Sequence, residues 1–256
     1  MGEVLAGNNA VWEFEPDALV IRYSRGVRGS RLLQALGERR VPHEALRGVE
    51  LTDGRKGTAV LRAEPWPGAD PLIETAAGQL KETADPYRLV VPDQNRVLAE
   101  FYRDELRAAI EAAGRAEPPA RFLVAAPPVP RSFKAYDAKA FFDGRTVVFR
   151  WFWTGASTAK WKAGDQSFPV EQLTGVDWRS PELLHGHLRL LLREEAAPPP
   201  GGTLHALGKA VPSPSEADQD PTAVVFGLGY GPVHESLPFA AAVLSAVQAA
   251  RVRPEP

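Results

Sequence analysis

The chain has 256 residues, a formal net charge of −2, 44% hydrophobic residues and no cysteine. The missing cysteine excludes disulfides, thiolate metal ligands and thiol nucleophiles, and it fits a reducing cytoplasm. The slightly negative charge argues against nucleic acid as a partner. We find no apolar run of about 18 residues that would predict a membrane span and no basic-then-apolar leader that would predict secretion.

The chain opens with two β-rich segments, residues 11–14 and 18–21. Glu15-Pro16-Asp17 separates them and has the composition of a hairpin turn. The following loop, RYSRGVRGSR, carries Arg22, Arg25, Arg28 and Arg31 without an acid among them. A strand pair followed by a basic loop is therefore predicted for this region.

The rest of the first half predicts more strands and a closing helix. Residues 41–50 read VPHEALRGVE, in which proline breaks a preceding helix and Gly48 permits a bend or bulge in a strand. A strand is expected over residues 57–63, a looser stretch over 64–84, and an apolar run after Asp85-Pro86. Apolar residues at helical spacing over 97–110, with Gly114 following, predict an amphipathic helix and its C-cap.

The second half repeats the first at an offset of 127–128 residues. Residues 168–177, FPVEQLTGVD, match 41–50, and FDGRTVVFRW at 142–151 matches FEPDALVIRY at 14–23. Asp143-Gly144 predicts a hairpin turn, and Asp220-Pro221 repeats the earlier Asp-Pro. We also expect a strand at 187–193, a mobile insertion at 194–219, and a helix with Ser236 as N-cap and Pro238 in its first turn.

These matches predict a duplicated domain. We assign residues 1–114 to the first domain, 115–135 to a proline-rich linker and 136–256 to the second domain. Phe122-Leu123-Val124 within the linker is expected to pack on a domain.

The Trp-x-Phe opening, the repeated Pro-x-Glu-x-Leu-x-Gly-Val element and the Asp-Pro strands resemble an uncharacterised bacterial family of tandem pleckstrin-homology-like (PH-like) domains. The resemblance covers about residues 8–112 and 136–250. It implies a mainly β fold with α (α+β): two tandem PH-like, partly open β-barrels, each closed by a C-terminal helix. It implies no catalytic residues.

Two segments are candidate ligand-binding sites. In the first, Arg22, Arg25, Arg28 and Arg31 alternate with glycines, which would let guanidinium groups and backbone N–H groups converge on a phosphate. In the second, RWFWTGASTAKWK, basic residues stand beside tryptophans, a pattern found at protein-docking and membrane-interface surfaces. The alternative in both cases is a structural one, with core aromatics and solvated charges. The candidates in the second segment are Trp151, Trp153, Lys160, Trp161 and Lys162.

Two other motifs are weaker indications of function. His185 and His187 have the spacing of two metal ligands on one strand face, but a polar turn entering a strand is the simpler interpretation. The glycine run Gly227 to Gly231 lacks the pattern of a dinucleotide site. We expect no metal and no cofactor.

The leading hypothesis is a non-enzymatic binding or scaffolding protein that engages a protein partner through two PH-like domains. The alternative is peripheral binding of an anionic lipid or phosphorylated ligand through the basic loop 22–31. Either function is compatible with a cytoplasmic protein, and the second with one at the inner face of the membrane.

Overall fold

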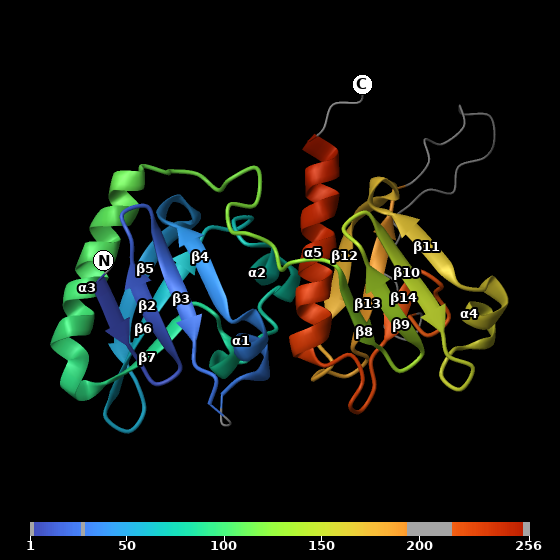
Figure 1. The fold of residues 1–256 in the computed structure, drawn as a ribbon, viewed down its shortest axis with the longest axis horizontal. Helices are drawn as coiled ribbons and strands as arrows, with labels where there is room; N and C mark the ends of the chain where they lie inside the picture. The colour runs from blue at the N-terminus through green and yellow to red at the C-terminus, as the bar shows by residue number, and fades with distance from the viewer. Residues whose placement is uncertain (1–2, 27–28, 194–216, 253–256) are drawn as a thin grey trace, which may run out of the picture. The chain divides into compact units, whose positions relative to one another are not determined.

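The computed structural model describes residues 3–26, 29–193 and 217–252 (Figure 1). The chain divides into two compact units, Met1–Pro127 and Pro128–Pro256. The division places residues 115–127, most of the expected linker, with the first unit. The backbone amides of Leu123 and Val124 both donate to the Ala69 carbonyl, at 2.8 and 3.0 Å, and Val124 is buried. This part of the proline-rich segment therefore packs on the first unit, as expected.

The first unit contains two antiparallel sheets, each with its strands in sequence order. The four-stranded sheet is β1 (Glu3–Ala6), β2 (Ala10–Phe14), β3 (Ala18–Tyr23) and β4 (Glu38–Pro42), and the three-stranded sheet is β5 (Leu46–Asp53), β6 (Thr58–Pro65) and β7 (Arg88–Pro92). The helices are α1 (Arg31–Leu36), α2 (Pro71–Ala76) and α3 (Arg96–Ala113), with short 3₁₀ turns η1 (His43–Ala45), η2 (Glu82–Ala84) and η3 (Asp93–Asn95).

The second unit repeats this order. Its four-stranded sheet is β8 (Arg131–Lys134), β9 (Ala138–Phe142), β10 (Thr146–Trp151) and β11 (Gln166–Pro169), and its three-stranded sheet is β12 (Leu173–Arg179), β13 (His187–Leu192) and β14 (Ala223–Val225). Helix α4 (Thr158–Ala163) stands where α1 stands, η4 (Val170–Gln172) where η1 stands, and α5 (Val233–Val252) ends the unit. Strand β8 lies in sequence that we had assigned to the linker.

Several local predictions are confirmed. The turn after β9 forms as expected: Asp143 Oδ1 accepts hydrogen bonds from the amides of Arg145 and Thr146, both at 2.8 Å, and these bonds lower the pKa of Asp143. The repeated glycine also acts as predicted, because the strand register shifts between Leu46 and Gly48 and again between Leu173 and Gly175. The two halves therefore bend their fifth strands in the same way.

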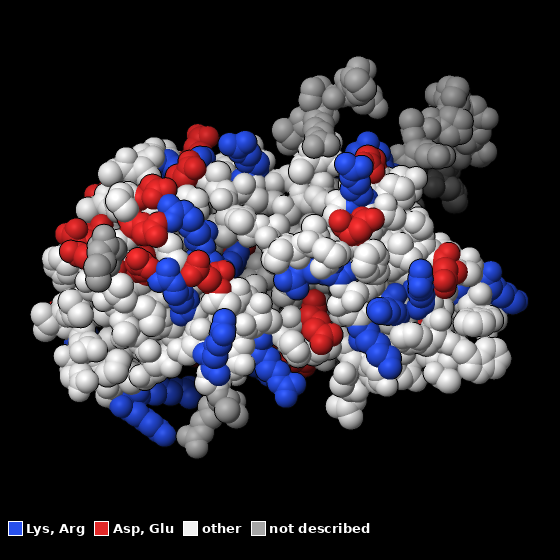
Figure 2. All heavy atoms as spheres, in the orientation of Figure 1, with Lys and Arg blue, Asp and Glu red and all other residues white. Residues whose placement is uncertain are grey.

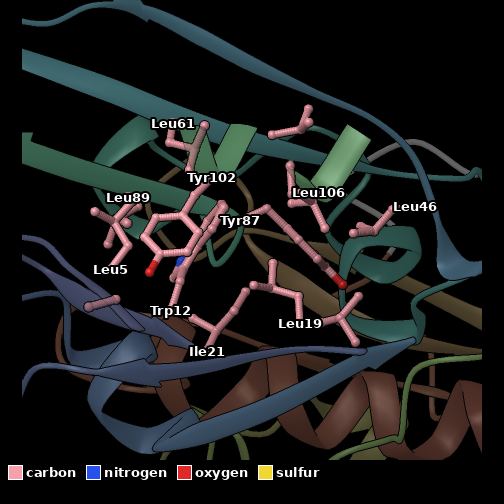
Figure 3. Close-up of a cluster of buried hydrophobic side chains, with 14 of the residues drawn as sticks. Leu5, Trp12, Leu19, Ile21, Leu46, Leu61, Tyr87, Leu89, Tyr102 and Leu106 are labelled. Atoms are coloured by element: carbon pink, nitrogen blue, oxygen red, sulfur yellow. The ribbon is translucent and has the colours of Figure 1, made fainter. Parts of the chain in front are cut away.

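The fold is α+β, with four open antiparallel sheets and no closed barrel among the described residues. Helix α3 packs against β5 and β6, and α5 against β12 and β8. In the first unit, side chains from both sheets and from α3 converge in one core (Figure 3). The rings of Phe14 and Tyr102 stack there, with centroids 4.5 Å apart.

Both closing helices differ in detail from the sequence prediction. The buried stripe of α3 is narrower, since Val97 and Phe101 are 77% and 50% exposed, although Gly114 is the C-cap with φ +68°. Ser236 is not the N-cap of α5, because the helix begins at Val233. Its hydroxyl instead donates to the carbonyl of Pro232 at 3.1 Å and accepts from Trp178 Nε1 at 3.1 Å.

Residues 194–216, most of the expected insertion, lie outside the described residues.

Candidate functional site

The connection between the third and fourth strands has the same backbone plan in both units but different exposed side chains. We call residues 24–37 and 152–165 the crossover elements. Each contains a six-residue helix that follows a serine, Ser30 or Ser157, and ends at a glycine, Gly37 or Gly164. Both glycines have φ near +70° (+68° and +70°), a backbone conformation that other residues rarely adopt. The frame is thus repeated, while the exposed side chains on it are basic in one copy and aromatic in the other.

The structure divides the arginines predicted for the first site. Arg22 lies on β3, where its guanidinium pairs with Glu38 at 2.7 Å and with Glu13. Arg25 and Arg31 lie on the crossover element, both exposed and without an ion pair among the described residues. Arg28 lies outside the described residues. The first crossover element therefore offers Arg25 and Arg31 to a ligand, whereas Arg22 is engaged by two carboxylates.

Two of the residues predicted for the second site are buried. Trp151 is 7% exposed, and its indole Nε1 donates to the Gly164 carbonyl at 2.7 Å. The side chain of Lys160 is fully buried, with Nζ 2.5 Å from Asp137 Oδ2 and 5.2 Å from the Trp151 ring centroid. Burial raises the pKa of Asp137, and the Lys160 ammonium opposes that rise. Trp151 and Lys160 hold the crossover element in place and are not available as surface anchors.

The other residues of this site lie at the surface. Trp153 is 77% exposed and Trp161 is 49% exposed. Their rings meet edge to face, with centroids 5.6 Å apart and an interplanar angle of 80°. Lys162 is exposed on the same helix as Trp161. Of the residues predicted for this site, the exposed ones are therefore the tryptophan pair and Lys162.

Three loops of the second unit meet near the Trp153–Trp161 pair. The Tyr136 amide donates to the Val225 carbonyl at 3.0 Å, and the Gly231 amide donates to the Lys134 carbonyl at 2.8 Å. A Cβ on Gly155 would lie 2.4 Å from the Tyr136 carbonyl oxygen, so the crossover element approaches the β8–β9 turn closely. The β8–β9 turn, the second crossover element and the β14–α5 loop therefore form one surface.

We call the exposed apolar side chains of these loops the hydrophobic end. It comprises Tyr136, Trp153, Trp161 and Leu228, which are 49%, 77%, 49% and 102% exposed. Sequence reasoning missed Tyr136 and Leu228 because nothing local distinguishes a loop tyrosine or leucine that packs from one that projects. The glycine run was the available signal, since it marked the loop that carries Leu228.

A lysine lies among the aromatic rings of this surface. Lys134 Nζ is 5.4 Å from the Phe152 ring centroid and 5.3 Å from that of Tyr230. The Tyr230 ring meets Tyr136 edge to face, with centroids 6.0 Å apart. Cation–π contacts of this kind, at exposed positions, contribute about 0.5–1 kcal/mol each. They order the rings that frame the hydrophobic end.

Of the two histidines, His187 has both ring nitrogens in hydrogen-bond contact with groups of the chain itself. His187 is buried, with Nε2 3.2 Å from Asp177 Oδ2 and Nδ1 2.9 Å from the carbonyl oxygen of His185. The hydrogen bond from His187 lowers the pKa of Asp177. The described part of the chain contains no group of three or more His, Cys, Asp or Glu side chains placed to hold a metal ion.

The repeated architecture and its two divergent crossover elements define a tandem α+β protein. A family model described as a domain of unknown function, DUF4429, matches residues 12–107 and again residues 140–244. The chain belongs to this family, with one copy of the domain in each unit. No curated protein matches the chain. Among the described residues, no helix combines the length and the apolar character needed to cross a membrane.

Proposed function

We propose that this protein is a non-enzymatic binding protein with two PH-like domains, and that its second unit engages a protein partner through the hydrophobic end. Support for the PH-like assignment is the arrangement common to both units: a four-stranded and a three-stranded antiparallel sheet with a C-terminal helix packed against them. The non-enzymatic role is supported by the surroundings of His187, which is buried and has both ring nitrogens in hydrogen-bond contact with groups of the chain itself. A cytoplasmic location fits the absence of cysteine.

The observation that carries the proposal is the exposure of the Trp153–Trp161 pair. Contact of large apolar rings with water is unfavourable in the free protein, so a cluster of exposed tryptophans often marks a binding surface. Tryptophan is also enriched among the residues that dominate binding energy in protein interfaces. The helix that carries Trp161 is anchored next to this ring, because the preceding residue, Lys160, forms a buried ion pair with Asp137. A preorganised surface loses less conformational entropy when a partner docks.

Cross-linking in cells that produce the protein tests this proposal. A photoreactive phenylalanine at position 153 should give a discrete cross-linked protein, and the same group at Phe141, a 41% exposed position on β9, should not. Serine at Trp161 should reduce the cross-link formed from position 153. Equal labelling at positions 153 and 141 would contradict docking at the hydrophobic end.

A second candidate function is peripheral binding of an anionic lipid or phosphorylated ligand by the first unit. The specific observation in its favour is that Arg25 and Arg31 are exposed and have no ion pair among the described residues. Vesicle flotation at low and high salt tests it, because binding that depends on exposed charge is screened by salt.

A further inference from the structure

Most arginines of the first unit are paired with an acid. Arg39, for example, makes two hydrogen bonds to Asp70, both 2.8 Å long, and Arg115 pairs with Glu44 at 3.1 Å. Ten arginines have such a partner: Arg22, Arg39, Arg40, Arg47, Arg62, Arg88, Arg96, Arg103, Arg107 and Arg115. Arginines without an acid partner are therefore the exception among the described residues of this unit.

The exceptions gather on two loops. Arg25 and Arg31 lie on the first crossover element, and Arg55 and Lys56 lie on the β5–β6 turn; all four are exposed. Outside these loops, Arg121 also lacks an ion pair among the described residues. We call Arg25, Arg31, Arg55 and Lys56 the basic edge.

Both loops of the basic edge project from the same, lower side of the first unit (Figure 1). Basic side chains follow the lower left edge of the molecule in Figure 2, whereas acidic and basic side chains are mixed higher on the same unit. The acid nearest to this turn along the chain, Asp53, is held by Arg96 at 2.7 Å. The cations of the turn are thus left without local neutralisation.

We propose that the basic edge binds the surface of an anionic lipid bilayer, through charge and not through a pocket for one headgroup. This inference deepens the second candidate function and is independent of protein docking by the second unit. Two separate loops that project to one side suit a plane of negative charge, which all four side chains can approach together.

The acidic hollow on the same unit supports the choice of the basic edge as the place where an anion binds. A hollow of about 570 Å³ is lined by Glu3, Glu13, Glu15 and Glu105 together with His43. Glu13 and Glu15 are paired with Arg22 and Arg40, but Glu3 and Glu105 have no ion pair among the described residues, and their carboxylates would repel a phosphate.

The size of the effect follows from the charge. One basic residue near an anionic leaflet contributes about 1 kcal/mol, or about fivefold in partitioning, and four contribute on the order of several hundredfold. The attraction decays within about 8–10 Å at physiological ionic strength. Binding should therefore depend on anionic lipid and on salt, with little preference among anionic headgroups.

Vesicle flotation of the full chain tests the proposal. The probes are vesicles of phosphatidylcholine alone and vesicles that also contain phosphatidylglycerol or phosphatidylserine, each at low and high NaCl. The site variant is R25S/R31S/R55S/K56S. The matched control, R47S/R62S/R103S/R107S, removes the same number of positive charges from the same unit, but from positions already paired with acids. Thermal unfolding of both variants tests whether each remains folded.

The wild-type chain should float with both kinds of anionic vesicle at low salt and with neither at high salt. The site variant should lose this binding, and the control should keep most of it. Equal loss in both variants would overturn the proposal, since net charge alone would then explain binding. Release by glycerol phosphate at constant ionic strength would also overturn it, in favour of a small-phosphate site, as would tighter binding to duplex DNA through the same four residues.

The lipid and protein functions can fail separately. W153S/W161S should leave flotation unchanged, because the tryptophans belong to the other unit. The site variant should leave cross-linking from position 153 unchanged. Salt-resistant flotation that W153S/W161S abolishes would assign membrane binding to the hydrophobic end and would contradict both proposals.

Discussion

Asp137 and Lys160 form a buried ion pair at two positions that are uncharged in the first unit. Their counterparts are Asn9 and Leu33, at offsets of 128 and 127 residues. The backbone roles are the same in both units: Asn9 Oδ1 accepts from the Val90 amide at 2.8 Å, and Asp137 Oδ1 accepts from the Val225 amide at 3.0 Å. The second unit thus has a buried charge pair at positions where the first unit has none.

Breaking this pair should destabilise the protein strongly. The Lys160→Leu variant leaves the Asp137 carboxylate buried without its cation, because the side chain of Asp137 is only 1% exposed. Removing one partner of a buried pair typically costs about 3–5 kcal/mol. We expect a loss of that size in the free energy of unfolding, measured by urea denaturation with tryptophan fluorescence.

The double variant D137N/K160L copies the first unit and supplies the control. Asparagine can still accept from the Val225 amide, and leucine leaves no buried charge. We expect the double variant to be more stable than K160L alone. If the two variants are equally unstable, the ion pair is not the source of the loss.

A second buried pair predicts a different response to a conservative change. Arg39 and Asp70 have side chains that are 6% and 0% exposed, and Asp70 also accepts from the Tyr87 hydroxyl at 2.7 Å and from the Leu72 amide at 2.9 Å. Arg39→Lys should destabilise the protein by several kcal/mol, because an ammonium cannot reproduce the two parallel hydrogen bonds. Urea denaturation measures this, with Arg47→Lys at an exposed pair as the matched control, where a change within about 0.5 kcal/mol is expected.

The exposure of the tryptophans can be checked without a partner. Trp153 is 77% exposed whereas Trp12 and Trp151 are buried, so Trp153→Phe should remove the largest single share of the fluorescence that acrylamide quenches. Its effect on stability should stay within about 0.5 kcal/mol. Trp151→Phe should instead lower stability, since the Gly164 carbonyl loses its indole donor, and should leave the quenchable emission nearly unchanged. The reverse pattern would place Trp153 in the core.

Features that depend on local backbone preference were predicted correctly from the sequence, whereas features that depend on contacts between distant residues were not. Hairpin turns and the glycine bulge depend on local backbone preferences, so Asp143 and Gly48 identified them correctly. The predicted start of α5 was wrong, because a serine near a proline has the composition of an N-cap wherever it lies in a helix. Ser236 lies inside α5, and its hydroxyl accepts a hydrogen bond from Trp178, which is distant in sequence.

The candidate sites show the same limit. Trp151 and Trp153 stand two residues apart in one β-rich run, but β10 ends at Trp151, so Trp151 packs in the unit while Trp153 projects from the turn that follows. The acids that neutralise Arg22 are Glu13 and Glu38, 9 and 16 residues away on β2 and β4, and only the pairing of these strands with β3 brings them to Arg22 and not to Arg25. Arg55 and Lys56 could be assigned to the basic edge only once the fold placed their turn on the same side of the unit as the crossover element (Figure 1).

The stability of the first unit should depend on the protonation of His43. Its side chain is largely buried in η1, and burial lowers its pKa from the ordinary value of about 6.5, although the nearby Asp17 and a hydrogen bond with the Ala18 backbone oppose the shift. The unfolded chain therefore takes up a proton on this residue more readily than the folded chain does. The stabilising contribution is complete above about pH 6.5 and is lost as the pH falls through the lower, folded-state pKa.

We expect the free energy of unfolding to decrease as the pH falls from about 6.5 through the lower, folded-state pKa of His43, and to decrease less in His43→Gln, which cannot titrate. His185→Gln is the control, because it removes an exposed histidine of the other unit. Urea denaturation at several pH values gives the comparison. Equal slopes for wild type and H43Q would show that the imidazole accepts a proton as easily in the folded chain as in water.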